Sequence, residues 1–218
     1  MPGSPTRGQI SLISAVATEP LTSGFRQRGV VGVDIDPTDA VALRRAALVA
    51  GVRNLNLAKV GFRGSDESLS TLDNEIFDHA YSRDVFEHLN NPVPLLKSVY
   101  PSLKPRGTFF VQIWPLWHSE WGAHLFDVFR PWQHLMGSRE EVLSKLTHPL
   151  HAMSYDSYAR TSIEDLQRAF LVVGFKPELV ELFTPAFRIP EFASNMPCTS
   201  MGTTGFKALL RSPNSSFA

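Results

Sequence analysis

Five polar side chains gather where a short strand is expected to end, in the sequence FDHAYSRDVFEH at residues 77–88. Phe77, Ala80 and Tyr81 indicate the strand itself. In an open parallel sheet, ligands bind beyond the carboxyl ends of the strands. Carboxylates and an imidazole in that place can exchange protons near neutral pH. The first candidates for chemistry are therefore Ser82, Arg83, Asp84, Glu87 and His88.

A further carboxylate, Asp34, ends the apolar run VVGVD at residues 30–34. An acid about 20 residues beyond the loop of a first strand can accept both hydroxyls of a nucleotide ribose. Asp34 and Asp36 are equally well explained as helix-capping carboxylates, because Pro37 suits the first position of a helix. Spacing alone leaves both interpretations open.

The elements that would position these residues alternate between strands and helices. Thr161 is expected to cap a helix that ends at Gly174. Pro101 should kink or shorten the helix that begins at Pro92. This alternation predicts a three-layer α/β/α sandwich, with a Rossmann-like, mostly parallel sheet and a C-terminal antiparallel strand pair. Strands are expected at 9–16, 30–34, 55–60, 77–81, 107–114, 175–183 and 205–210, a glycine turn at 105–107, and helices at 21–28, 37–50 and 92–104.

Residues 115–150 interrupt the alternation with three of the four tryptophans and several histidines, and no periodic pattern. This predicts an insertion or lid. We expect one domain over residues 1–211 that carries the insertion at about 115–150, and a flexible tail over 212–218. No metal site is predicted, because the spacing of His118, His124, Asp127 and His134 matches no known zinc pattern.

Composition favours a soluble globular protein. The chain has 218 residues, of which 43% are hydrophobic and 11% aromatic, which is enough for one sizeable core. Lys plus Arg equals Asp plus Glu at 21 each, so no net field favours nucleic acid or an anionic membrane. The single Cys198 fits a reducing compartment. Without a signal sequence or a long apolar run, we expect a cytoplasmic protein that binds neither nucleic acid nor membrane.

Four stretches together resemble the class I S-adenosylmethionine-dependent methyltransferases, in particular the methyltransferase type 11-like members. They are VVGVDIDP, GSDESL, FDHAYSRDVFEHL and LKPRGTFFVQIWP, in the order and at the approximate spacing of that family. With the closing strand GFKALLR, the resemblance covers about residues 9–211. It implies S-adenosylmethionine as the cofactor and a small-molecule or glycan-like acceptor.

The resemblance also implies roles for individual residues. Asp34 would bind the ribose hydroxyls and Ile35 would pack on the adenine. Asp66 would accept a hydrogen bond from the adenine amino group, with Glu67 as the alternative. Ser82 and Arg83 would lie near the methionine end of the cofactor.

Glu87 and His88 match a Glu-His pair that is frequent in the family. His88 is the candidate general base, and a histidine held at a helix start by a backbone contact is the alternative. The insertion resembles what some small-molecule and glycan-modifying members place over the active site. Its implied acceptor contacts, along with Glu87, are Trp117, His118, Trp121, His124 and Trp132. The alternative is that the tryptophans pack the insertion onto the sheet, or onto a second copy or partner subunit.

The chain departs from the family in one respect. The family carries a glycine-rich loop directly after the first strand, whereas this chain has no glycine between Gly8 and Gly24, and SAVATEP stands there. A Cβ atom in such a loop strains the backbone and fills cofactor space. A catalytically inactive regulatory or scaffold protein is therefore the alternative to an enzyme. A nicotinamide-dependent oxidoreductase would share Asp34, but it needs the same missing glycines.

Overall fold

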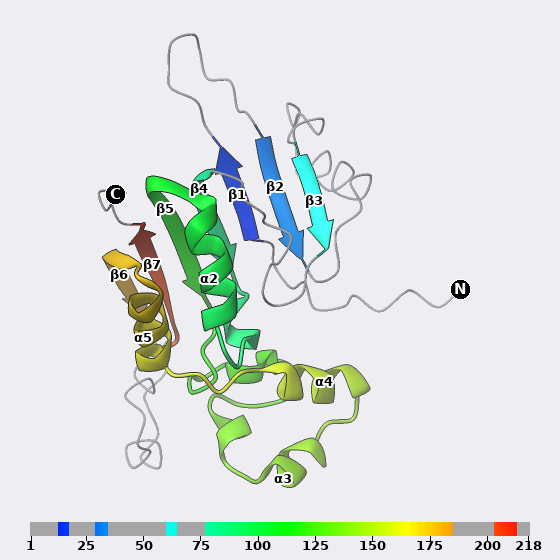
Figure 1. Ribbon diagram of the computed structural model, residues 1–218. Helices are drawn as coiled ribbons and strands as arrows, with labels where there is room; N and C mark the ends of the chain where they lie inside the picture. Colours follow the sequence, from blue (N-terminus) through cyan, green and yellow to red (C-terminus); the bar gives the residue numbers. More distant parts are fainter. Residues whose placement is uncertain (1–12, 18–28, 35–59, 65–76, 185–202, 213–218) are drawn as a thin grey trace.

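The computed structural model describes residues 13–17, 29–34, 60–64, 77–184 and 203–212 (Figure 1). They form an α/β fold around one seven-stranded sheet of order β3-β2-β1-β4-β5-β7-β6, which confirms the predicted fold class. The strands are β1 (Ile13–Ala17), β2 (Gly29–Asp34), β3 (Val60–Gly64), β4 (Phe77–Arg83), β5 (Leu103–Ile113), β6 (Lys176–Phe183) and β7 (Gly205–Arg211).

Five of these strands run in one direction, and β1 and β7 run in the other. β2 pairs in parallel with β3, and β4 with β5. β1 pairs antiparallel with both β2 and β4, so β2 and β4 share one direction. β7 lies antiparallel between β5 and β6, as predicted for the C-terminal pair. The carboxyl ends of β2 and β4 therefore meet at the same edge of the sheet.

The reversal of β1 changes what lies at that edge. Ile13 pairs with both Val33 and Ser82, so the start of β1 lies at the carboxyl edge of β2 and β4. Ala17, at the end of β1, pairs with Gly29 at the other edge. Residues 13–17 are strand, which confirms part of the strand expected at 9–16, so the first residues of SAVATEP belong to a strand rather than to a loop.

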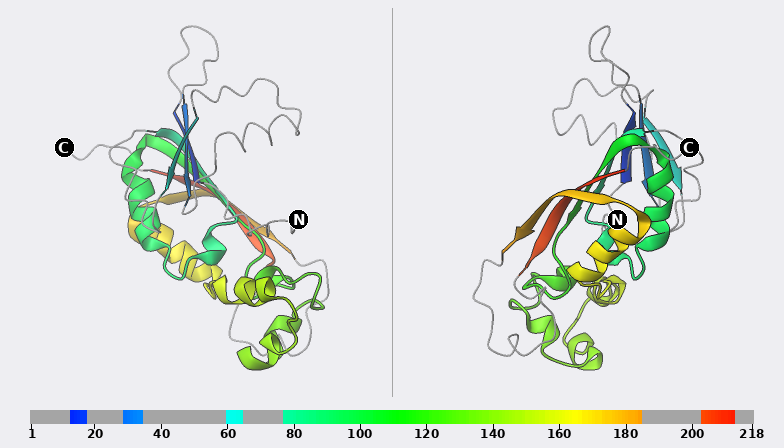
Figure 2. Two further views of the ribbon diagram at one scale, coloured as in Figure 1. Left: turned by 90° about the vertical axis from the view of Figure 1, so that its right-hand side faces the viewer. Right: turned by 60° about the vertical axis from the view of Figure 1, so that its left-hand side comes forward.

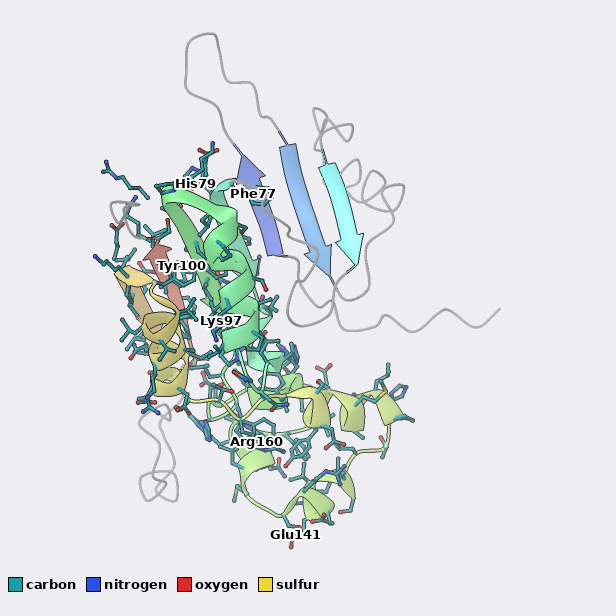
Figure 3. All side chains as sticks on the ribbon, in the orientation of Figure 1. Phe77, His79, Lys97, Tyr100, Glu141 and Arg160 are labelled. Carbon is teal, nitrogen blue, oxygen red and sulfur yellow. The ribbon has the colours of Figure 1, made fainter. Side chains whose placement is uncertain are left out.

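Two helices cover one face of the sheet: α2 (Val93–Ser102) and α5 (Ile163–Val173) (Figures 1 and 2). Their apolar positions recur at helical spacing and are buried against the alternating inward residues of β4 and β5. Figure 3 labels Tyr100 on α2, whose ring meets Phe175 edge-on at 5.0 Å. The buried helical residues are Leu95, Leu96, Val99, Leu166, Ala169 and Phe170.

The chain enters β5 earlier than predicted. α2 ends at Ser102, just after Pro101, and β5 already begins at Leu103. The expected turn at 105–107 is instead an irregularity within β5, where the pairing with β4 shifts register and Arg106 has a φ of 64°. Glycine is required at 107, because a Cβ atom there would lie 2.8 Å from the carbonyl oxygen of Lys104.

Two other boundaries differ from the prediction, and a third agrees with it. β3 lies at Val60–Gly64 rather than 55–60. The cap of α5 is Ser162, whose hydroxyl accepts from the backbone N–H of Asp165, because the Thr161 hydroxyl donates instead to the Leu89 carbonyl oxygen at 3.2 Å. α5 ends at Gly174 with a φ of 105°, as expected. The predicted helices at 21–28 and 37–50 lie outside the described residues.

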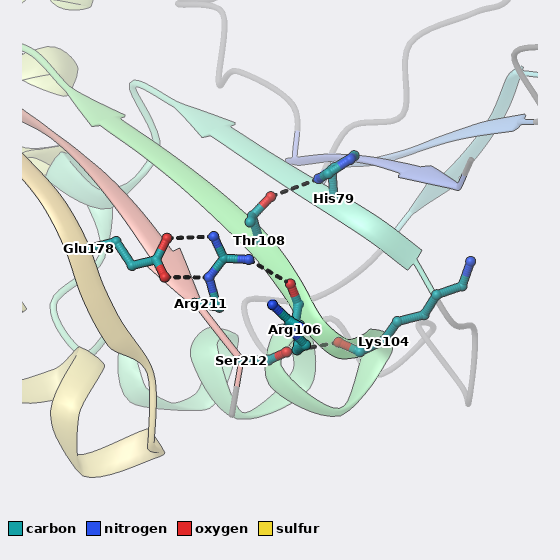
Figure 4. Close-up of polar contacts among 7 residues, drawn as sticks. All are labelled: His79, Lys104, Arg106, Thr108, Glu178, Arg211 and Ser212. Atoms are coloured by element: carbon teal, nitrogen blue, oxygen red, sulfur yellow. Dashed lines mark hydrogen bonds and ion pairs between the residues drawn. The ribbon is translucent and has the colours of Figure 1, made fainter. Parts of the chain in front are cut away.

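Polar contacts join β4 to β7 at the end of the sheet opposite the carboxyl edge (Figure 4). His79 Nδ1 and Thr108 Oγ1 lie 2.7 Å apart between β4 and β5. Arg211 of β7 forms a bidentate ion pair with Glu178 of β6 and donates to the Arg106 carbonyl oxygen at 3.1 Å. These contacts fix the register of the strands that carry the candidate site at their other ends.

The segment after β5 packs as a separate layer next to the carboxyl end of that strand (Figures 1 and 3). It contains the short helices η3 (Gly122–His124), η4 (Gln133–Leu135), α3 (Arg139–Leu143) and α4 (Pro149–Ser157). Its own apolar cluster includes Trp117, Phe129, Val142, Tyr155 and Tyr158. Among the residues placed by the structure, no helix is long and apolar enough to cross a membrane.

The direction of β1 can be tested by disulfide trapping in a chain whose Cys198 is replaced by Ser. Val16 pairs with His79, whereas Arg83 lies four residues further along β4, about 13 Å away. We expect Val16→Cys with His79→Cys to form a disulfide on mild oxidation, and Val16→Cys with Arg83→Cys to remain reduced. Mass spectrometry of tryptic peptides measures both. The opposite pattern would show that β1 runs parallel to β4.

Candidate functional site

The candidate site begins where β4 turns sharply at its carboxyl end. Asp84 has a φ of 52°, and its backbone N–H continues the ladder to the Gln112 carbonyl oxygen at 2.9 Å. The chain then enters η2 (Phe86–His88). Phe86 is fully buried against the rings of Phe109 and Phe170. This anchor fixes the positions of the two residues that follow it.

Glu87 is a buried carboxyl group without a partner. Its side chain is 3% exposed, and neither carboxylate oxygen has a hydrogen-bond partner of normal geometry among the described residues. Burial raises the pKa of Glu87 well above its usual range, which its own backbone N–H only partly offsets, and the charge of Asp84 adds to the rise. Such a group is costly to bury unless a ligand satisfies it.

Two histidines lie beside Glu87, and their hydrogen bonds set which nitrogen carries the proton. His88 Nδ1 lies 3.3 Å from the Ser157 carbonyl oxygen, which can only accept, so Nδ1 donates and Nε2 keeps a lone pair. Tyr158 donates its hydroxyl proton to the Pro115 carbonyl oxygen at 2.6 Å. The Tyr158 oxygen then accepts from His124 Nε2 at 3.3 Å, which leaves the lone pair on Nδ1.

Glu87, His88 and His124 converge on one point. One ligand-type atom from each lies within 4.8 Å of the other two. Burial lowers the pKa of His88, and it lowers the pKa of His124 to about 4, with a smaller contribution from His88. Both imidazoles are therefore neutral near pH 7 and can act as bases or as metal ligands.

Ser82 and Asp84 place further acceptors at the same edge. Ser82 is completely buried, and neither its Oγ nor Asp84 Oδ1 has a partner among the described residues. Burial raises the pKa of Asp84, and the adjacent Arg83 opposes this rise. Arg83 is mostly exposed and donates from Nε to Asp84 Oδ2 at 3.1 Å.

Asp34 is the last residue of β2, at the same edge as Arg83. Because Ile13 pairs with both Val33 and Ser82, Asp34 and Arg83 each lie one residue beyond it on either side of β1. The structure thus brings the main-chain positions of these two predicted cofactor residues to one edge. The other predicted cofactor residues, Ile35, Asp66 and Glu67, lie outside the described part of the chain.

The predicted acceptor contacts in the insertion differ in burial. Trp117 is 5% exposed and packs against Tyr155, Tyr158 and the Arg160 guanidinium, 4.3 Å from its ring centre. Arg160 is labelled in Figure 3 at the junction of the insertion and the sheet. Trp132 is also buried. These rings stabilise the insertion and are not presented to a ligand.

Trp121, His118 and His124 are only partly buried. Trp121 and His124 surround Phe126, with ring centres 5.6 and 5.7 Å away, and Trp114 stacks on the same ring at 5.7 Å. We call Trp114, Trp121, His124 and Phe126 the aromatic group. His118 has a lowered pKa, caused by burial and then by the charge of Arg160. The aromatic group connects with the site through His124.

His118, His124 and His134 are close in sequence but do not form one cluster in the structure. His134 is buried and donates from Nε2 to the Trp117 carbonyl oxygen at 2.8 Å, and Asp127 is exposed. His124 alone joins Glu87 and His88. Sequence reasoning missed Ser157 and Tyr158, which orient the two histidines, because about 70 residues separate them from His88 and no local pattern marks them.

A separate groove of about 450 Å³ lies between the residues that follow η2 and the start of α5. Asn90, Arg160, Thr161 and Arg168 are among its lining residues. Glu87, His88 and His124 do not line it. The convergent side chains, rather than this groove, define the candidate site.

Comparison with known proteins shows what the sheet is similar to. A family model for a methyltransferase domain matches residues 14–111, which span β1 to most of β5. Residues 14–111 are therefore similar to a methyltransferase domain, and the match covers a little less than half of the 218-residue chain. None of the curated proteins matches the sequence significantly.

Solved structures share the fold of this chain at low sequence identity. An S-adenosylmethionine-dependent methyltransferase from Methanosarcina mazei is 13% identical over 85% of this chain and 82% of its own, with a TM-score of 0.52. A candidate sarcosine dimethylglycine methyltransferase from Galdieria sulphuraria is 15% identical over 84% and 69%, with a TM-score of 0.50. The [4+2]-cyclase SpnF is 12% identical over 87% and 67%, with a TM-score of 0.52.

The end of β4 offers acceptors of the kind that S-adenosylmethionine would need. S-adenosylmethionine carries a cationic sulfonium and a cationic amino group, and the unpartnered Ser82 Oγ and Asp84 Oδ1 are acceptors suited to such groups. The arrangement around β1 does not match what the resemblance implies for cofactor binding. The resemblance places a glycine-rich loop directly after this strand, but here Ala17 ends β1 at the opposite edge.

The buried His134 predicts a loss of stability in acid. Its pKa is lowered to about 4, mainly by burial, from the 6.5 expected in the unfolded chain. Between pH 6.5 and pH 4 the imidazole of His134 is therefore protonated in the unfolded chain but neutral in the folded one. Its neutral form costs nothing above pH 6.5, and the free energy of unfolding falls by about 3 kcal/mol as the pH drops to about 4. Urea unfolding followed by tryptophan fluorescence at several pH values measures this.

The matched variant is His134→Gln, which keeps a side-chain N–H donor but does not titrate. It should be less stable than the wild type at pH 7 and should show a shallower decline between pH 6.5 and 4. Identical slopes for the two proteins would contradict the assignment of His134 as a buried neutral imidazole.

Proposed function

We propose that the protein is an S-adenosylmethionine-dependent methyltransferase that acts on a small-molecule or glycan-like acceptor. The observation that carries the proposal is the group of buried, unpartnered acceptors on Ser82, Asp84 and Glu87 at the carboxyl end of β4. Buried polar groups are normally hydrogen-bonded, so their exceptions mark positions where a ligand completes the site. The family match supplies the class of ligand.

The residues at the carboxyl ends of β2 and β4 would bind opposite ends of the cofactor. Asp34, at the end of β2, would accept from the ribose hydroxyls. Ser82 and Asp84 would face the cationic amino acid end, and the exposed guanidinium of Arg83 would bind its carboxylate. When bound, S-adenosylmethionine supplies an electrophilic methyl group whose bond to sulfur breaks with both electrons left on the sulfur.

His88 would act as the general base that removes a proton from the acceptor. Its Nε2 lone pair is free because Nδ1 donates to Ser157, and its lowered pKa keeps the ring neutral near pH 7. As an acceptor oxygen or nitrogen bonds to the methyl carbon, Nε2 can take the proton that the acceptor loses. The contact with Ser157 orients the ring for this role.

The aromatic group supports an acceptor with flat or apolar faces. Trp114 and Phe126 stack on each other with exposures of 38% and 40%, so part of each ring faces outward. Such rings contribute apolar area at little conformational cost. Placed next to His124, they would hold an acceptor and exclude water from it.

The reversed β1 favours a second candidate, a methyltransferase-like scaffold protein without catalysis. The sheet is compatible with other activities, because SpnF has this fold and is a [4+2]-cyclase. The segment SAVATEP has no glycine, and Ala17 ends β1 at the edge opposite Asp34. Cofactor binding separates the two candidates.

Isothermal titration calorimetry of the full chain with S-adenosylhomocysteine tests the proposal. We expect binding with 1:1 stoichiometry, and Asp34→Ala should weaken it by about 10-fold or more, since each charge-assisted hydrogen bond contributes roughly 1.5–3 kcal/mol. Glu140→Ala is the matched control, because Glu140 is an exposed carboxylate on α3 of the insertion. It should bind the ligand as the wild type does.

Circular dichroism verifies that both variants are folded. A folded wild-type protein that shows no binding at millimolar ligand would overturn the enzyme proposal and favour the scaffold. Equal weakening by Asp34→Ala and Glu140→Ala would remove Asp34 from the site.

A further inference from the structure

We propose that Glu87, His88 and His124 form a binding site for a divalent transition-metal ion. The three side chains come from the turn after β4 and from η3 of the insertion, 36 residues apart, and each offers one ligand atom within 4.8 Å of the others. Two imidazoles and a carboxylate are a common ligand set for such ions. No single stretch of sequence contains the site.

The unpartnered carboxyl group of Glu87 points independently to a cation. If Glu87 is ionised, its negative charge lies on a side chain that is only 3% exposed and has no hydrogen-bond donor of normal geometry among the described residues. If it is protonated, its hydroxyl still has no acceptor among the described residues. A metal ion bonded to the carboxylate removes both difficulties, whereas an ordinary structural role for Glu87 removes neither.

The hydrogen bonds around the histidines leave them ready to coordinate. His88 donates Nδ1–H to the Ser157 carbonyl oxygen, and His124 donates Nε2–H to the Tyr158 hydroxyl oxygen. Each ring therefore keeps one lone pair. Metal-bound histidines typically donate their other ring N–H to an oxygen in this way, which fixes the tautomer and the ring orientation.

The surrounding chain holds the ligands together. The backbone N–H of Ala159 donates to the Glu87 carbonyl oxygen at 2.7 Å, which joins the segment carrying Ser157 and Tyr158 to η2. The rings of His88 and His124 both meet Tyr158 edge-on at 5.2 Å. Asp84 adds a nearby negative charge. These contacts limit how far the ligands can separate.

The ligand set selects the class of ion. Nitrogen ligands favour Zn²⁺, Co²⁺ and similar transition metals over Mg²⁺ and Ca²⁺, which prefer oxygen alone. Three ligands that share such an ion in tetrahedral geometry, with bonds of about 2.1 Å, lie roughly 3.4 Å apart, so the side chains need to close by at most about 1.4 Å from the 4.8 Å limit. Three protein ligands also leave a coordination position open, which an acceptor oxygen can fill if the proposed methyltransferase function holds.

This proposal differs from the expectation of no metal, which considered His118, His124, Asp127 and His134 as a group. Only His124 of that group lies in the proposed site. The metal proposal also competes with the role of His88 as a free base, because the Nε2 lone pair cannot serve both at once. Binding experiments on the metal distinguish these roles.

Titration of the EDTA-treated full chain with Co²⁺ tests the site without relying on activity. We expect one equivalent of Co²⁺ to produce visible d–d absorption, and one equivalent of Zn²⁺ to abolish it by displacement. Glu87→Gln, which keeps the size of the side chain, and His124→Ala should each weaken Co²⁺ binding by about 100-fold or more. The matched control is His79→Ala, an exposed histidine at the opposite end of β4, which should bind Co²⁺ like the wild type.

Circular dichroism confirms the fold of each variant before titration. The absence of d–d absorption in the folded wild type, or unchanged Co²⁺ affinity in Glu87→Gln, would overturn the metal site. S-adenosylhomocysteine binding measured on the same EDTA-treated protein reports on the proposed function separately. Cofactor binding without Co²⁺ binding would reject the metal site and keep the methyltransferase, and the reverse result would reject only the methyltransferase.

Discussion

The buried carboxyl group of Glu87 is the constraint on which the site depends. Phe86, fully buried between Phe109 and Phe170, fixes the turn that carries Glu87 into the interior. The insertion then closes over it, with Ala159 bonded to the Glu87 carbonyl oxygen and Tyr158 supporting both histidines. An apolar side chain at position 87 would make the fold more stable, since an unsatisfied buried carboxyl group lowers stability. The carboxyl group therefore points to a function rather than to a role in folding.

The sheet brings the residues proposed to bind cofactor and acceptor to one edge, although one of its strands is reversed. β2 and β4 run in the same direction, so Asp34 and the cluster after β4 meet at one edge despite the antiparallel β1 between them. The cofactor roles proposed for Asp34 and Ser82 therefore do not depend on the direction of β1. Binding of the cofactor without a glycine-rich loop would have to rely more on side chains at the ends of β2 and β4.

Sequence patterns predicted the elements better than the site. The apolar runs at 30–34 and 77–81 identified β2 and most of β4, and Gly174 marked the end of α5, because burial and backbone conformation restrict residue type locally. β5 began earlier than expected, because its irregular pairing around Arg106 looks like a turn in sequence. The meeting of Glu87, His88 and His124 depends on how the insertion folds back, which no local pattern encodes.

A crystal structure of the protein with S-adenosylhomocysteine and Co²⁺, with anomalous diffraction measured at the cobalt edge, tests both proposed sites together. We expect the cofactor at the carboxyl ends of β2 and β4, with its ribose at Asp34, and one anomalous peak bonded to Glu87, His88 and His124. A cofactor bound elsewhere, or a Glu87 carboxyl group that stays without any ligand while cobalt lies at another position, would contradict this expectation.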